Sequence, residues 1–157
     1  MGSQSKIDFA YIAGFLDGDG SLMLQLKKRA DGKKKWRFMF TICFYQDTRH
    51  EAPLHWIKDI LQIGYISRRN DGMSELRING FLQVRDIPKN LLPYIKFKKV
   101  QAKAMYVASD ILCRDKKLTE FQLVRLVDCI LQIQGSNYVT RHKKTKTELY
   151  SFLGLTP

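Results

Sequence analysis

Apolar residues in the N-terminal part of the chain follow first one spacing and then another, and the change marks the boundary between two predicted elements. From Ile7 they recur three and four positions apart, which predicts a helix. We expect this helix to end near Gly18 or Gly20, because glycine is common just past a helix end. Apolar and polar residues then alternate, which predicts a strand whose apolar face contains Leu22, Leu24 and Leu26.

A return strand and a second hairpin follow. Residues 36–45 alternate between an apolar set and a mixed set, and the basic run KKRADGKKK before them is typical of a hairpin turn. The same pattern returns around residues 63–67 and 74–80, on either side of the turn sequence RRNDG. Two antiparallel hairpins are therefore expected.

Helices are predicted between and after the hairpins. Thr48 and Glu51 form the Thr-x-x-Glu pattern of a capping box, and the apolar residues behind them have helical spacing. From about residue 81 onward the chain has helical patterns, with a basic segment TRHKKTK near its end. This order predicts an α+β fold with an antiparallel sheet, in one domain over residues 7–157. Residues 1–6 are expected to be a disordered tail or a cloning remnant.

The charge of the chain narrows the class of partner. Its 157 residues include 27 Lys and Arg against 15 Asp and Glu, a formal net charge of +12, which favours a polyanion. Nucleic acid is the first expectation, a ribosome-like assembly the second and an anionic membrane a distant third. The three cysteines form no CxxC pair, which argues against a zinc site and favours a reducing compartment. No apolar run approaches the roughly 20 residues of a membrane span, and MGSQSK lacks a signal-peptide core.

Two acids are unexpected in so basic a chain, Asp17 and Asp19 in the stretch IAGFLDGDG. They do not start a calcium loop of the EF-hand type, because the positions that need Gly and Glu hold Leu22 and Lys28. The helix before them has a face of small residues, which lets a second backbone approach closely. If that backbone is the same helix of a second copy, two-fold symmetry brings both acidic ends together. The predicted dimer contacts are Ala10, Ala13, Gly14 and Asp17.

Two carboxylates that meet repel each other unless a cation lies between them. A divalent cation with hard oxygen ligands can activate water for phosphodiester cleavage, and Mg²⁺ suits such ligands. We therefore expect Asp19 to bind a metal, whereas a helix-capping role and a functional role stay equally open for Asp17. The three histidines form no metal-binding pattern, and no small-molecule cofactor is expected.

The stretch IAGFLDGDG resembles the LAGLIDADG motif of homing endonucleases. A strand and a basic hairpin follow it, then the strand TICFYQ and later the segment LLPYIKFKKVQA, in the order found in single-motif members. The resemblance covers about residues 7–153 and implies a saddle-shaped, four-stranded antiparallel sheet backed by helices, in an αββαββα arrangement. It also implies a homodimer that cuts both strands of a long, pseudo-palindromic DNA target across the minor groove and leaves 3′ overhangs.

The resemblance implies roles for individual residues. In the family the last acid of the motif and the backbone carbonyl before it hold the metal, which points to Asp19 and Gly18. A glutamine after the second strand orders the water network, and Gln46 stands in that place. A lysine near the scissile phosphate corresponds to Lys98, with Lys96 as its neighbour.

A further basic residue often lies early in the helix after that glutamine. Here the place holds His50 with Arg49 adjacent, and which of the two serves stays open. The resemblance also implies Mg²⁺ as the cofactor, with Mn²⁺ able to substitute and Ca²⁺ binding without supporting cleavage.

The polar face of the sheet is expected to read base edges in the major groove, because the aliphatic face would pack on helices. The basic runs of the first hairpin and of the C-terminal segment are expected to contact phosphates. The predicted DNA-binding residues are Met23, Gln25, Lys27, Arg29, Lys33, Lys34, Lys35, Arg37, Met39, Thr41, Cys43, Tyr45, Ser67, Arg69, Glu75, Arg77, Asn79, Arg141, Lys143 and Lys144.

Other functions are compatible with the same scaffold. An RNA maturase or a non-catalytic DNA- or RNA-binding protein would keep the basic surface, but the presence of Asp19, Gln46 and Lys98 favours cleavage. A ribosome-associated protein would explain the charge but not the acids between glycines. Members of the family often initiate intron mobility from organellar genomes. The resemblance therefore implies a protein encoded in a chloroplast or mitochondrion, or otherwise intracellular, whose partners are double-stranded DNA and a second copy of itself.

Overall fold

A computed structural model describes residues 5–30 and 36–157 and contains a four-stranded antiparallel sheet in the order β1-β2-β4-β3. The strands are β1 (Gly20–Lys28), β2 (Trp36–Asp47), β3 (Tyr65–Arg68) and β4 (Met73–Asn79). The helices are α1 (Lys6–Asp19), the short 3-10 helix η1 (Thr48–His50), α2 (Ala52–Leu61), α3 (Phe81–Leu91), α4 (Lys99–Arg114), α5 (Glu120–Ser136) and α6 (Lys146–Leu153). The predicted α+β class and element order are confirmed, and the predicted first hairpin turn at 31–35 lies outside the described residues.

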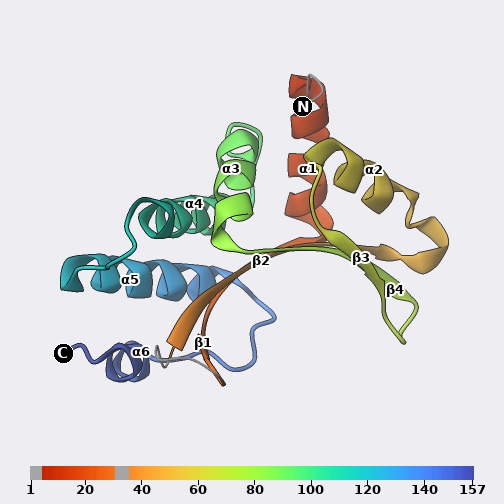
Figure 1. Cartoon of the computed structure of the whole chain (residues 1–157). Coiled ribbons are helices and arrows are strands. Elements are labelled where there is room, and N and C mark those ends of the chain that lie inside the picture. Colours follow the sequence, from red (N-terminus) through yellow and green to blue (C-terminus); the bar gives the residue numbers. More distant parts are fainter. Residues whose placement is uncertain (1–4, 31–35) are drawn as a thin grey trace.

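The alternation of apolar and polar residues gives the sheet one buried face. Gly20 pairs with Phe44 and Lys28 with Trp36 at the two ends of the β1–β2 ladder. Helices α1 to α5 lie on one side of the sheet (Figure 1). The strand residues that are fully or almost fully buried in the core are Leu22, Leu24, Leu26, Phe40, Ile42, Phe44, Leu76 and Ile78. Within the described part of the chain, no helix combines the length and apolar character needed to cross a bilayer.

The predicted capping box at Thr48 and Glu51 is wrong. Asp47 caps the 3-10 helix instead, and Glu51 precedes α2 without a side-chain cap bond. The Glu51 carboxylate accepts bonds from the Arg68 guanidinium and from the Ser74 hydroxyl, and the Arg68 bond is the main reason why the pKa of Glu51 falls to about 2. Glu51 therefore joins the start of α2 to β3 and β4.

Gly64 shows where the fold requires glycine, and it supports a prediction about stability. Its φ is +97°, and a Cβ there would lie 2.9 Å from both Leu76 Cδ1 and Ile78 Cγ1. Gly64→Ala should lower the free energy of unfolding by about 2–5 kcal/mol, because the backbone strain costs about 1–2 kcal/mol and the overpacking about 1–3 kcal/mol. Urea unfolding measures the loss.

Gly72→Ala is the matched control for this substitution. Gly72 also has a positive φ, +81°, but a Cβ there meets nothing within 4 Å. It should lose only the backbone contribution of about 1–2 kcal/mol. Equal losses at the two glycines would contradict the role of the contacts with Leu76 and Ile78.

Candidate active site and polar sheet face

Helix α1 ends at Asp19, and β1 begins at once with Gly20. Gly20 has an extended φ of −121°, so glycine is not needed here for a left-handed turn. A Cβ at Gly20 would instead lie 2.8 Å from the backbone of Leu16. This close approach allows the chain to pass from helix to strand without a loop, and it leaves the Asp19 side chain exposed at the junction.

The Asp17 carboxylate is bound to a distant segment of the same chain. Its Oδ2 accepts the backbone N–H groups of Lys96 at 2.7 Å and Phe97 at 3.1 Å, and its Oδ1 accepts that of Lys98 at 2.9 Å. Burial alone would raise the pKa of Asp17, but these three bonds and the Lys98 charge outweigh it and hold the pKa below its usual value. Asp17 therefore does more than end helix α1.

The side chain of Lys98 contacts the end of the motif helix α1. Its Nζ donates to the backbone carbonyl of Asp17 and lies 5.2 Å from the centre of the Phe97 ring. Burial lowers the pKa of Lys98, while the carboxylates of Asp17 and Asp19 act in the opposite direction. The structure thus brings the Lys98 ammonium to the end of α1 that carries Asp19.

Gln46 lies at the same end of the sheet. The β1–β2 ladder ends where Gly20 faces Phe44, and Gln46 is two residues further along β2. Its side chain is half-buried, and its Oε1 accepts the backbone N–H of Asp47 at 2.9 Å. The predicted water-ordering residue is therefore close in the fold to the junction that carries Asp19.

The structure distinguishes between the two basic residues that follow. The Arg49 guanidinium donates to Asp47 Oδ1 at 3.0 Å and to Oδ2 at 2.8 Å. The Arg49 bond is the first cause that holds the pKa of Asp47 well below its usual range. Both Arg49 and His50, the last residue of the 3-10 helix, are exposed, so the residues differ in the Asp47 partner of Arg49 and not in accessibility.

The donor set for a cation is open. Asp19 and Gly18 are both exposed, and among the described residues no three or more His, Cys, Asp or Glu side chains are grouped to hold a metal. One copy of the chain therefore supplies at this point the Asp19 carboxylate and a backbone carbonyl. Mg²⁺ usually keeps several waters and is bound by one or two carboxylates together with substrate phosphates, so this donor set fits it.

The predicted dimer face of α1 is only partly exposed. Ala10 and Gly14 are exposed, and a Cβ at Gly14 meets nothing within 4 Å. Ala13 is 0% exposed and packs in the core of its own chain, and the Asp17 carboxylate binds residues 96–98, so neither points outward as predicted. The exposed Ile7 and Tyr11, which the prediction omitted, extend the surface.

Side chains on the polar face of the sheet pair with one another. Thr41 Oγ1 donates to Asn79 Oδ1 at 3.0 Å across β2 and β4. Arg77 Nε donates to Glu75 Oε1 at 3.1 Å along β4. These bonds fix the donors and acceptors that the face presents.

The predicted base-reading residues differ in accessibility. Thr41 is 2% and Cys43 0% exposed, so the expectation that they contact bases is not supported; burial also raises the pKa of the Cys43 thiol. Glu75 is nearly buried as well. Lys33, Lys34 and Lys35 lie outside the described residues. The exposed members are Gln25, Lys27, Arg29, Arg37, Arg69 and Asn79, and the half-buried ones are Met23, Met39, Tyr45, Ser67 and Arg77.

The segment after α5 covers the outer edge of β1. Asn137 Nδ2 donates to the Leu22 carbonyl at 3.0 Å, and Lys144 Nζ donates to the Leu26 carbonyl at 2.8 Å. Satisfying these edge carbonyls protects β1 from pairing with another chain. Asn137 was missed from the sequence, where an amide after a helix carries no signal of a bond to a strand 115 residues away.

Lys144 also holds the C-terminal helix against the sheet. Its Nζ lies 5.6 Å from the centre of the Trp36 ring and 5.1 Å from that of Phe152. Lys144, which was predicted to contact a phosphate, is therefore bound by partners within its own chain. The other two predicted residues of this segment, Arg141 and Lys143, are exposed.

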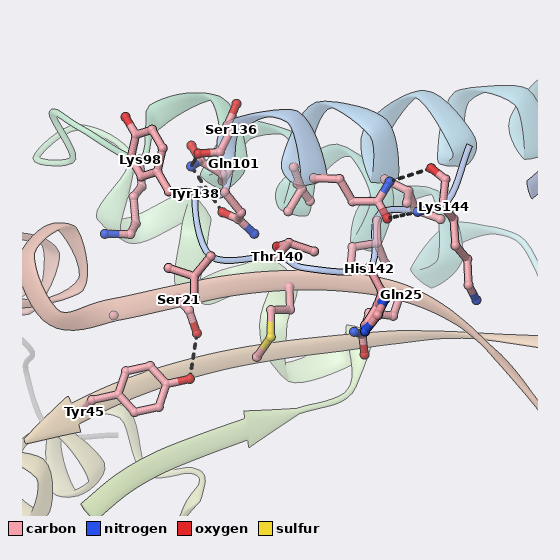
Figure 2. A pocket seen from close by; sticks show the side chains of 18 of the residues that line it. Ser21, Gln25, Tyr45, Lys98, Gln101, Ser136, Tyr138, Thr140, His142 and Lys144 are labelled. Atoms are coloured by element: carbon pink, nitrogen blue, oxygen red, sulfur yellow. Dashed lines mark hydrogen bonds between the residues drawn. The ribbon is translucent and has the colours of Figure 1, made fainter. Parts of the chain in front are cut away.

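A groove of about 950 Å³ runs between this segment and β1. Figure 2 shows the bond between Ser21 and Tyr45 (3.0 Å) on one side of the groove and Lys98 and Tyr138 at one end. Burial raises the pKa of the Tyr45 phenol. Tyr138 is 82% exposed and was not predicted as a site residue, although it stacks on Phe97 with ring centres 5.8 Å apart.

Comparisons with known proteins agree on one family. The family model described as LAGLIDADG endonuclease matches residues 12–107. DNA endonuclease I-CvuI of Chlorella vulgaris is 36% identical over 98 residues, which are 62% of this chain and 61% of the relative. DNA endonuclease I-CreI of Chlamydomonas reinhardtii is 30% identical over 92 residues, which are 59% of this chain and 56% of the relative. The matched segment thus spans less than two thirds of the length of either relative.

Solved structures extend the similarity over nearly the whole chain. The crystal structure of I-CvuI in complex with its target in the presence of 2 mM Ca has a TM-score of 0.74 at 28% identity and covers 97% of this chain and 98% of its own. An archaeal intron-encoded homing endonuclease complexed with DNA has a TM-score of 0.79 at 20% identity and covers 94% and 95%. The second likeness concerns the fold alone.

Proposed function

The chain belongs to the LAGLIDADG endonuclease family, and from this premise we propose that it is a site-specific double-strand DNA endonuclease that acts as a homodimer. The target would be a long, pseudo-palindromic duplex, cut across the minor groove to leave 3′ overhangs. The observation that carries the proposal is that the Lys98 ammonium donates to the backbone carbonyl of Asp17, two residues before Asp19 in the motif.

The proposed reaction is the hydrolysis of a phosphodiester bond. A divalent cation held by Asp19 and the Gly18 carbonyl would supply Lewis acidity and an activated water. Gln46 would orient that water, and the Lys98 ammonium would stabilise the negative charge that develops on the phosphate. Because the Arg49 guanidinium is paired with Asp47, we assign the role of the further basic residue after Gln46 to His50.

We propose Mg²⁺ as the working cation, with Mn²⁺ able to substitute and Ca²⁺ able to bind without supporting cleavage. The oxygen donors of the site favour hard divalent cations. Crystal structures of the relative I-CvuI are described with Mg, where the DNA is not cleaved, and with Ca. These structures support the use of a divalent cation in the family.

The dimer would form through the exposed part of α1. Ala10 and Gly14 would let two α1 helices approach closely, with Ile7 and Tyr11 adding apolar area. This contact would place the two Asp19 carboxylates near the two-fold axis, so that each copy would serve one DNA strand. The basic residues beyond the sheet, among them Arg29, Arg141 and Lys143, would contact phosphates and position the duplex.

We also propose an organellar origin. The two curated relatives come from the green algae Chlorella vulgaris and Chlamydomonas reinhardtii. A gene carried by a chloroplast or mitochondrial genome would fit a family that moves introns.

A cleavage screen tests the proposed function. The protein should produce Mg²⁺-dependent double-strand breaks at one or a few members of a DNA library, and sequencing of the ends should show 3′ overhangs. With Ca²⁺ the same targets should be bound but not cut. Binding without any break in Mg²⁺ or Mn²⁺ would contradict the nuclease and favour an RNA maturase or a non-catalytic DNA- or RNA-binding protein.

A further inference from the structure

Asp17 makes the contact that joins the motif helix to the start of α4. Its two carboxylate oxygens accept three consecutive backbone N–H groups, those of residues 96–98, which lie 79 to 81 positions away in the sequence. These amides come directly before α4, which begins at Lys99. The carboxylate thus binds the segment that leads into α4, and of its three partners only Lys98, the N-cap, belongs to the helix end.

This contact fixes Lys98 at both ends. The Lys98 backbone N–H is bound by the Asp17 side chain at 2.9 Å, and the Lys98 Nζ donates to the Asp17 backbone carbonyl. A flexible lysine stem normally samples many rotamers. Here Asp17 alone binds both the backbone N–H and the side-chain ammonium of Lys98.

The neighbouring acid has the opposite character. Asp19 is exposed, whereas Asp17 is half-buried and turned toward the α4 segment. Because both acids lie in the last turn of α1, the Asp17 contact also sets how far the Lys98 ammonium stands from the Asp19 carboxylate. A substitution that shifts the Asp17 contact would therefore change the distance between the Lys98 ammonium and the Asp19 carboxylate.

We propose that Asp17 is a positioning residue for DNA cleavage, acting through Lys98; this inference rests on the proposed nuclease function. Asp17 touches neither the cation nor the phosphate. It holds the residue 96–98 segment so that the Lys98 ammonium meets the phosphate beside Asp19. Asp17→Asn keeps the size of the side chain but replaces one acceptor oxygen with an NH₂ group that faces N–H donors.

A double-mutant cycle on single-turnover cleavage in Mg²⁺ separates positioning from general stability. Asp17→Asn should slow cleavage by about 10- to 100-fold, the usual effect of losing a group that orients an active-site residue. Lys98→Met removes the ammonium, and adding Asp17→Asn to it should slow cleavage by less than about 2-fold, because coupled residues are not additive. Target affinity measured in Ca²⁺ should change by less than about 3-fold in both single variants, if contacts elsewhere carry the binding.

Asp8→Asn is the matched control. Asp8 lies on the same helix, and its carboxylate also accepts a backbone N–H, that of Ser5 at 3.2 Å, but at the other end of α1. Its cleavage rate should stay within about 2-fold of the wild type. An equal loss from Asp17→Asn in the wild-type and Lys98→Met backgrounds, or no loss at all, would overturn the positioning role.

Hydrogen exchange gives a readout that needs neither cation nor DNA. At least one of the Phe97 and Lys98 amides should exchange faster in Asp17→Asn than in the wild type or in Asp8→Asn, because they bind different carboxylate oxygens and the substitution replaces one of these oxygens with an NH₂ group. Unchanged exchange at both amides would overturn the inference even if the wild-type protein cuts DNA. A wild-type protein that never cuts DNA would instead contradict the proposed function, while faster exchange would still identify Asp17 as the residue that holds Lys98.

Discussion

Asp19→Asn should reduce the rate of DNA cleavage by on the order of 10³-fold, because a metal ligand supplies several kcal/mol of transition-state stabilisation and each 1.36 kcal/mol is about tenfold in rate. The side chain is exposed at the junction of α1 and β1, so an amide of the same size should not disturb the fold. Single-turnover cleavage in Mg²⁺ measures the rate, and fluorescence anisotropy in Ca²⁺ measures the affinity for the target. We expect the affinity to change little, because the sheet face and the basic segments would supply most DNA contacts.

Asp128→Asn serves as the control for this substitution. Asp128 is an exposed acid on α5, outside the proposed site, and the variant removes the same charge from the chain. Its cleavage rate should match that of the wild type. Equal cleavage by Asp19→Asn would remove Asp19 from the mechanism, and a large loss of affinity would assign it to DNA binding instead.

Gly14→Leu should break the dimer while leaving the subunit folded. A Cβ at Gly14 meets nothing within 4 Å in one chain, and replacing a helical glycine adds about 0.5–1 kcal/mol of helix stability. In a close helix–helix contact, overpacking costs about 1–3 kcal/mol, and two-fold symmetry applies it twice, so the dimer dissociation constant should rise about 30-fold or more. Sedimentation velocity at micromolar concentration measures this change. The variant should also lose the ability to make double-strand breaks.

Gly135→Leu is the matched control for the dimer. Gly135 is also a helical glycine, on α5, and a Cβ there again meets nothing within 4 Å. Its mass in solution should equal that of the wild type. A wild-type protein that sediments as a monomer, or a Gly14→Leu variant that stays a dimer, would contradict the proposed interface.

The alternation of apolar and polar residues predicted the strands and the buried face of the sheet. Because side chains alternate across a strand, the apolar residues of β1 and β2 had to share one face, and the structure buries Leu22, Leu24 and Phe40 together. The end of α1 was also predictable, since glycines interrupt the helix there. The structure supplies the physical reason at Gly20, where a side chain would collide with the Leu16 backbone.

Long-range polar contacts were beyond the reach of the pattern. Nothing in the spacing of IAGFLDGDG shows that Asp17 binds amides 79 to 81 residues away. The basic segment near the C-terminus likewise does not show that Lys144 binds the Leu26 carbonyl. A local rule also misled at Glu51, where the expected capping bond lost to ion pairing with Arg68. Such choices depend on which segments the tertiary fold brings together, and local propensity does not contain that information.

The distance along the chain between Asp17 and Lys98 affects when the site can form during synthesis. At about 5–20 residues per second, translation needs roughly 4–16 seconds to pass from one residue to the other. Contacts that span 115 and 118 residues, from Asn137 to Leu22 and from Lys144 to Leu26, close later still. A nascent or truncated chain therefore carries the motif acids without a placed lysine or a covered strand edge. An unfinished chain would therefore lack the arrangement of Asp19 and Lys98 on which the proposed cleavage depends.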